Sequence, residues 1–177
     1  MAVSRWLFVT GHKCKVRNMS KASEPNKATE LRSQLVEVAL QWQDRFGVAP
    51  AITSAISELD AALLIGMTDD EYCSDCAERT AVREGWDFKF RECRYQVKAN
   101  RPSGRTGSPV TLVAKAHNYD WDKLIWMLYD RNYGLQEAWE WDVDEYRKAF
   151  ESVPRVRPKD MRRGRPLFPA PHPDSTP

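Results

Sequence analysis

The sequence predicts a mixed α/β domain in which helices flank a sheet, and three observations carry this prediction. Apolar residues recur at helical spacing in the first part of the chain. The pattern then changes to short runs rich in aromatic and β-branched residues, which is typical of strands. A helical pattern returns near residue 150. This order of elements indicates a mixed sheet covered by helices.

Three helices are expected before the strands. The first covers residues 29–46, and its apolar residues stand at helical spacing: Leu31, Leu35, Val38, Trp42 and Phe46. The second covers residues 51–66. The third is a short acidic helix in the stretch TDDEYCSDCAER, and it begins at a cap formed by Thr68 or Asp69.

Four strands and a closing helix are expected after them. WDFKF and RYQVKA are joined by REC and predict a hairpin. The loop RPSGRTGSP separates the hairpin from KLIWMLYD, an apolar run that indicates a central strand covered on both faces. LQEAWEWD predicts a further strand, and DVDEYRKAFESV predicts the last helix.

One folded domain is expected over residues 28–153. Residues 1–27 show no apolar period, and residues 154–177 are rich in Pro and Arg, so both ends are expected to be disordered. The chain has 177 residues, which is enough for one domain with a sizeable core.

Composition indicates a soluble protein with basic ends on an acidic body. The net charge is +2, yet residues 1–21 hold five basic residues and no acid, and residues 153–177 hold six basic residues against two acids. Basic ends fit either contacts to a polyanion or ordinary solvated tails. No apolar run is long enough to span a membrane or to serve as a signal peptide, so a cytoplasmic location is expected.

The predicted hairpin gathers polar residues of three kinds. Gln96 and Lys98 are two positions apart on one strand and therefore share a face, and Asp87 on the neighbouring strand can lie beside them. A carboxylate, an amide oxygen and an ammonium suit a divalent cation with a phosphate. The alternative is a solvent-facing strand on which Asp87 and Lys98 form an ion pair.

Glu58 is a second acid of interest, because its helical neighbours are small or apolar: Ser54, Ala55, Ala61, Ala62 and Ile65. Burying an unpaired carboxylate is costly, so Glu58 is expected to have a partner such as a metal, a lysine or a hydrogen-bond donor. The alternative is an acid at the edge of the apolar arc.

The ordered set ISELDAALLIG, GWDF and RYQVK resembles the PD-(D/E)xK nuclease superfamily, which has the restriction-endonuclease-like fold. The resemblance covers roughly residues 29–152. It implies that Glu58 is the helix acid, Asp87 the main metal ligand, Gln96 the variable acid position and Lys98 the catalytic lysine. It also implies that the carbonyl oxygen of Val97 completes the metal shell.

The resemblance further implies a metal-dependent DNA endonuclease that uses Mg²⁺ or Mn²⁺, of a kind that acts in restriction or in defence against phages and mobile elements. Many relatives of this kind are dimers, so a homodimer is compatible with it. The superfamily more often has Asp or Glu where this chain has Gln96. That departure leaves an alternative open, a catalytically inactive DNA-binding or interaction module on the same fold.

Five basic residues flank the candidate site and are interpreted as phosphate contacts: Arg91, Arg94, Arg101, Arg105 and Lys115. The alternative for them is a solvated loop. Cys73 and Cys76 form a CxxC, which suggests a third reading, a small zinc-stabilised adaptor. A structural zinc site needs four ligands, usually as two close pairs, so reduced thiols are the preferred interpretation. His117 is a general base or a loop residue.

Overall fold

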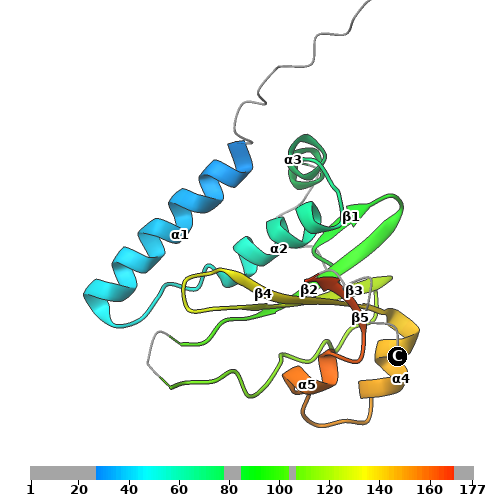
Figure 1. Ribbon diagram of the computed structural model, residues 1–177. Helices are drawn as coiled ribbons and strands as arrows, with labels where there is room; N and C mark the ends of the chain where they lie inside the picture. The colour runs from blue at the N-terminus through cyan, green and yellow to red at the C-terminus, as the bar shows by residue number, and fades with distance from the viewer. Residues whose placement is uncertain (1–26, 78–84, 104–106, 170–177) are drawn as a thin grey trace, which may run out of the picture.

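A five-stranded sheet with the order β1-β2-β3-β4-β5 lies at the centre of the protein (Figure 1). The structure is a computed structural model, and it describes residues 27–77, 85–103 and 107–169. Helices lie on both sides of the sheet. The predicted mixed sheet flanked by helices is therefore confirmed.

Three helices lie on one side of the sheet: α1 (Lys27–Phe46), α2 (Thr53–Leu64) and α3 (Asp69–Ala77). All three were predicted, with small shifts at their ends. Of the two expected caps of α3, the structure uses Thr68, whose hydroxyl accepts a hydrogen bond from the Glu71 backbone N–H at 3.3 Å. In return, the Glu71 carboxylate accepts a bond from the Thr68 backbone N–H at 2.7 Å. This reciprocal pair satisfies two otherwise unpaired donors at the helix start.

The strands follow the predicted order, and one further strand is added at the end. They are β1 (Phe88–Phe90), β2 (Cys93–Asn100), β3 (Lys123–Tyr129), β4 (Leu135–Asp142) and β5 (Arg165–Phe168). Only the β2–β3 pair is parallel, and the other three pairs are antiparallel. The predicted central strand is β3, whose residues are almost all buried.

Two apolar clusters fill the two faces of the sheet, because alternate residues of a strand point to opposite faces. Val97 and Ile125 are neighbours in the parallel register and pack with α1 and α2. Leu124 and Trp126 pack with the segment before β3 and with α4 (Val143–Phe150) on the other face. We call the face with Val97 and Ile125 the α2 face, and the face with Leu124 and Trp126 the α4 face.

The prediction of a disordered tail from residue 154 is wrong for residues 154–169. This segment contains α5 (Pro158–Met161) and the strand β5, which pairs with β4. Val156 and Met161 are buried in the cluster of the α4 face. The folded domain therefore extends to residue 169. Residues 170–177 and residues 1–26 of the expected extension 1–27 lie outside the described residues, whereas Lys27 begins α1.

The predicted apolar stripe of α1 forms a surface and not a core contact. Its five residues are large and exposed: Leu31, Leu35, Val38, Trp42 and Phe46. The helix packs on the α2 face through a different side, which carries Val36, Ala39 and Leu40. Helix α1 therefore has two apolar sides, of which one has no cover within the described residues.

Candidate functional site

Asp87 stands directly before β1, at the end of the β1–β2 hairpin away from its turn, and lies opposite Gln96. Its backbone N–H donates to the Tyr95 carbonyl oxygen at 2.7 Å, which continues the ladder one residue beyond β1. Its carboxylate oxygen Oδ2 accepts the backbone N–H of Val97 at 2.5 Å and also the Nε2 amide group of Gln96. The predicted contact between Asp87 and Gln96 is therefore present.

The Gln96 amide group lies between two oxygen atoms. Besides Asp87 Oδ2, its Nε2 is 3.3 Å from the carbonyl oxygen of Val97. Gln96 itself is buried. The amide N–H group thus occupies the space between a carboxylate and a carbonyl oxygen. A half-turn about the last side-chain bond of Gln96 would bring its oxygen Oε1 to the same space.

This donor set fits a hard divalent cation, because a carboxylate, a backbone carbonyl and an amide oxygen are all oxygen ligands. The set contains a single acid, Asp87. Accordingly, no cluster of three or more His, Cys, Asp and Glu side chains suited to a metal occurs within the described ranges. The residues present fit Mg²⁺ or Mn²⁺ better than zinc, which prefers sulfur and imidazole ligands.

Lys98 points to the α4 face together with Gln96. Its neighbour in the β2–β3 register is Trp126, a member of the cluster on that face. Lys98 is half-buried, and in the part of the chain that the structure describes its ammonium group has no ion-pair partner. The alternative in which Lys98 pairs with Asp87 across the hairpin is therefore not what the structure shows.

Glu58 lies on the other side of the sheet from this pair. It is a half-buried residue of α2, and α2 packs on the α2 face through Ile56, Ala61 and Ala62. Gln96 and Lys98 point away from that face. The geometry brings Asp87, Gln96 and Val97 together.

Two of the predicted phosphate-binding arginines are bound by other groups of the chain. The Arg94 guanidinium forms two hydrogen bonds with the Asp122 carboxylate, at 3.0 and 3.1 Å. These bonds, with the Arg94 backbone N–H, hold the pKa of Asp122 below its ordinary value. Arg101 donates to Gln43 at 2.7 Å and stacks over the Tyr133 ring at 4.2 Å.

The other predicted basic residues differ in their surroundings. Lys115 donates from its ammonium group to the carbonyl oxygens of Glu151 and Val153, at 2.8 and 3.1 Å. Arg91 stands in the β1–β2 turn, where its guanidinium lies over the Phe90 ring at 4.8 Å. Arg105 lies outside the described residues. The Lys115 ammonium group is therefore bound to backbone carbonyl oxygens of the chain, whereas the Arg91 side chain is exposed on the surface.

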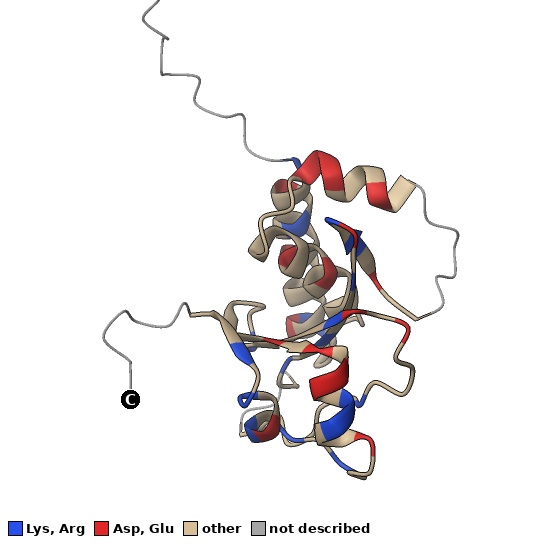
Figure 2. Ribbon diagram, turned by 90° about the vertical axis from the view of Figure 1, so that its right-hand side faces the viewer, with Lys and Arg blue, Asp and Glu red and all other residues tan. Residues whose placement is uncertain are grey.

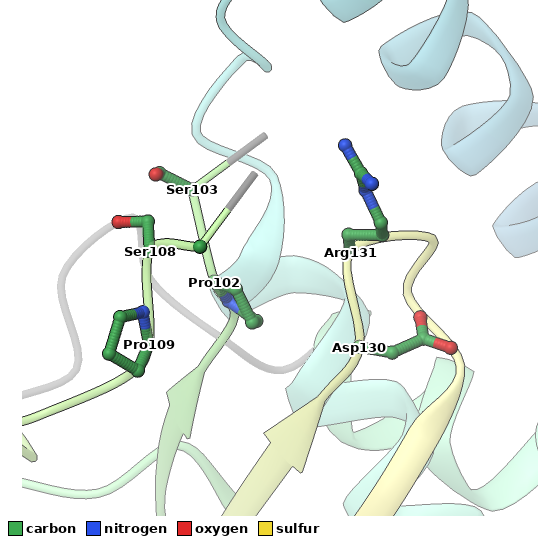
Figure 3. A pocket seen from close by; sticks show the side chains of 7 residues that line it. Pro102, Ser103, Ser108, Pro109, Asp130 and Arg131 are labelled. Atoms are coloured by element: carbon green, nitrogen blue, oxygen red, sulfur yellow. The ribbon is translucent and has the colours of Figure 1, made fainter. Parts of the chain in front are cut away.

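A cleft of about 470 Å³ opens beyond the ends of β2 and β3 (Figure 3). One wall is the Gly- and Pro-rich loop with Pro102, Ser103 and Ser108, and the other is the β3–β4 turn with Asp130 and Arg131. The Asp130 carboxylate accepts two backbone N–H groups of its own turn and is therefore structural. None of the candidate catalytic residues lines this cleft.

The cysteines do not form a metal site within the described residues. Cys73, Cys76 and Cys93 are free thiols, and Cys73 and Cys76 line an apolar groove between α1, α2 and α3. His117 is exposed on the segment before β3. The zinc-stabilised alternative therefore gains no support from these residues.

Sequence reasoning missed a set of basic residues near the end of the chain. Arg155, Arg157 and Lys159 were assigned to a disordered tail, yet they lie in the ordered segment and line a groove with Arg162. The signal that could have found them is the alternation of Arg155 and Arg157 around the apolar Val156. That pattern is typical of a chain with one side buried.

No protein-family model matches the sequence, and no curated protein matches it. Within the described ranges, no helix combines the length and apolar character needed to cross a membrane.

Proposed function

We propose that this chain is a metal-dependent endonuclease that hydrolyses phosphodiester bonds in DNA, on a restriction-endonuclease-like fold. The observation that carries the proposal is the meeting of Asp87, Gln96 and the Val97 carbonyl at one point of the hairpin. Lys98 follows on the same face of β2. An ordered carboxylate, carbonyl, amide and lysine on one strand pair is the set that this chemistry needs.

Asp87 and the Val97 carbonyl oxygen would hold Mg²⁺ or Mn²⁺, and Gln96 would add its amide oxygen after rotation. When bound, the ion polarises the scissile phosphate and lowers the pKa of a bound water. Lys98 would stabilise the negative charge that develops on a phosphate oxygen. An ammonium group without an ion-pair partner within the described residues is free to do this, because none of the described acids competes for it.

A second candidate function is a DNA-binding module that has lost metal chemistry. The observation in its favour is the contact of the Gln96 N–H group with Asp87 and Val97, since the amide fills the space between the two oxygens. A site closed in this way has to break two hydrogen bonds before it can take a cation. Binding of Mn²⁺ by the purified protein separates the two candidates.

The proposal is tested by incubating the full chain with supercoiled plasmid DNA in Mg²⁺, in Mn²⁺ and with excess chelator. We expect nicked or linear products with either metal and none with chelator. The Asp87→Asn variant keeps a side chain of the same size and should lose cleavage. If the protein binds Mn²⁺ and the plasmid nevertheless stays intact under all conditions, the catalytic assignment is refuted.

Glu58→Gln is the variant that decides the role of the helix acid. Because α2 packs on the face opposite to Gln96 and Lys98, cleavage should survive this change if Glu58 is structural. Loss of cleavage with an unchanged unfolding midpoint would instead place Glu58 in the site, around the edge of β2.

A further inference from the structure

The segment after α4 presents a basic groove on the α4 face of the protein. The groove has a volume of about 540 Å³ and lies between the chain at Val110–Leu112 and the start of α5. Four basic residues line it and no acid does: Arg155, Arg157, Lys159 and Arg162. Figure 2 shows basic residues around α5 and the chain that leads to it.

Three of these four charges are available to a ligand. Arg162 is committed to the Glu137 carboxylate, with hydrogen bonds at 2.7 and 2.8 Å. Arg155, Arg157 and Lys159 are exposed, and within the described residues none of them forms an ion pair. Asp160, the one acid between them and Arg162, accepts the Arg157 backbone N–H at 2.9 Å and so faces its own turn.

The backbone that bears the groove is anchored by buried residues, unlike that of a charged tail. Val156 is 1 % exposed between Arg155 and Arg157, and its carbonyl oxygen accepts the Val113 N–H at 2.9 Å. Met161 is fully buried, and its carbonyl oxygen accepts the indole N–H of Trp141 at 3.0 Å. Binding a polyanion here therefore costs little backbone ordering.

The groove and the candidate site share one face of the sheet. Val156 and Met161 belong to the same apolar cluster as Leu124 and Trp126. Leu124 and Trp126 are the register neighbours of Gln96 and Lys98. A polyanion in the groove therefore lies on the side of the sheet to which the candidate catalytic side chains point.

We propose that this groove binds the phosphate backbone of duplex DNA, with Arg155 and Arg157 contacting phosphates of one strand. Arg157 has an extended backbone, so the two side chains emerge on the same side of the chain, about 7 Å apart. The choice of duplex DNA as ligand rests on the proposed function. The location of the groove rests on the structure alone.

The test measures binding without cleavage. A fluorescent duplex of about 20 base pairs, roughly two helical turns, is titrated with the full chain in chelator at several salt concentrations. The groove variant is Arg155→Gln with Arg157→Gln. The control is Lys27→Gln with Arg45→Gln, which removes the same charge from exposed positions on α1. Each phosphate contact contributes about 0.9 to the slope of log affinity against log salt.

We expect the groove variant to lower the slope by about 2 and the affinity by at least 10-fold at physiological salt, whereas the control changes both much less. Equal effects of the two variants would overturn the proposal, since net charge alone would then explain binding. A groove variant that weakens binding to anionic phospholipid vesicles but not to the duplex would overturn it too. DNA binding through the groove by a protein that never cuts would refute the nuclease and leave this inference standing.

A second, independent observation concerns the exposed side of α1. Leu31, Leu35, Val38, Trp42 and Phe46 are 39–60 % exposed, and Val48, just beyond the helix, is exposed as well. At about 150–250 Å² for a large side chain, the six leave roughly 600 Å² of apolar surface uncovered. This is at the upper end of what a monomer normally exposes in one patch.

We infer that this stripe pairs with the same stripe of a second copy of the chain. Two copies would bury on the order of 1,200 Å² from the six side chains alone, which is the lower limit for a stable interface. The Trp42 and Phe46 rings lie in tilted contact, with their centroids 4.6 Å apart, and supply the aromatic anchors that such interfaces favour. Gln34 and Gln41 flank the stripe and donate to the Glu30 and Glu37 carboxylates of their own helix.

Sedimentation equilibrium of the full chain at micromolar concentration tests this inference. Two copies per particle are expected for the wild type and one for Val38→Glu, because a charge in the middle of the stripe opposes burial. Leu112→Glu, at an exposed apolar residue away from α1, is the control and should stay dimeric. A monomeric wild type, as would follow if residues 1–26 of the same chain cover the stripe, would overturn the inference, and so would a dimeric Val38→Glu.

Discussion

The Asp87 carboxylate and the Gln96 amide are joined across the β1–β2 hairpin, and the same Asp87 oxygen also holds the backbone N–H of Val97. In this arrangement the Gln96 N–H group occupies the position beside the Asp87 carboxylate that a cation would take. The carboxylate is thus satisfied without a metal. In the proposed metal site, the affinity for Mg²⁺ would be set by how readily the Gln96 amide gives up this contact.

Gln96→Glu should therefore raise metal affinity. A second carboxylate beside Asp87 offers an oxygen ligand of full charge and removes the competing N–H group. We expect at least 10-fold tighter Mn²⁺ binding by calorimetry and a lower unfolding midpoint in chelator, because two like charges then face each other. Unchanged Mn²⁺ affinity would show that position 96 does not touch the ion. Gln136→Glu, at an exposed residue of β4, is the control.

Asp60 holds α1 and α2 on the sheet, and its loss should be costly. Its carboxylate pairs with Arg32 at 2.5 and 2.7 Å and accepts the Tyr129 hydroxyl at 2.8 Å, with both charged side chains mostly buried. Asp60→Ala leaves the Arg32 charge unpaired and should destabilise the protein by about 3–5 kcal/mol in urea unfolding. Glu151→Ala breaks the exposed pair with Arg147 and should cost less than about 1 kcal/mol. Equal costs would contradict this account.

The order of the elements up to α4 and the contact between Asp87 and Gln96 could be predicted from the sequence. Both follow from periods, 3.6 for the helices and 2 for the hairpin strands, which a single chain displays directly. The strand β3 was found because it is apolar throughout. Because β3 is apolar on both faces, its sequence does not indicate which face α2 covers: Leu124 and Ile125 are equally suited to either side.

Two further misses have the same kind of cause. Val156 and Met161 are single apolar residues in a segment of Arg and Pro, so no period marked them as core anchors. The stripe of α1 has a clear helical period, yet a period does not say whether the partner surface belongs to the same chain. Val36, Ala39 and Leu40, the residues that do pack inward, form a second and less obvious apolar side.

Stability should fall in acid through Glu137. Hydrogen bonds from Arg162 hold the pKa of Glu137 below its ordinary value of 4.5. A carboxyl whose pKa is lower in the folded state stabilises the protein above its unfolded pKa, and this contribution is lost as the pH falls through the folded pKa. Between about pH 5 and 3, the unfolding midpoint should therefore drop more for the wild type than for Glu137→Gln. Parallel pH profiles of the two proteins would contradict the assignment.

Lys98 gives the most direct test of the proposed chemistry, through Lys98→Ala and Lys98→Arg. Because Lys98 forms no ion pair within the described residues, neither change should lower the unfolding midpoint by much. A compact ammonium can lie within hydrogen-bond distance of one phosphate oxygen, and the wider guanidinium cannot take that place without displacing the substrate. Both variants should therefore lose cleavage by a factor on the order of 10² or more. DNA affinity in chelator should fall only modestly, since Arg155 and Arg157 still hold the backbone. Cleavage by Lys98→Ala at near the wild-type rate would exclude the assigned role, and restored cleavage in Lys98→Arg alone would show that only a positive charge is needed.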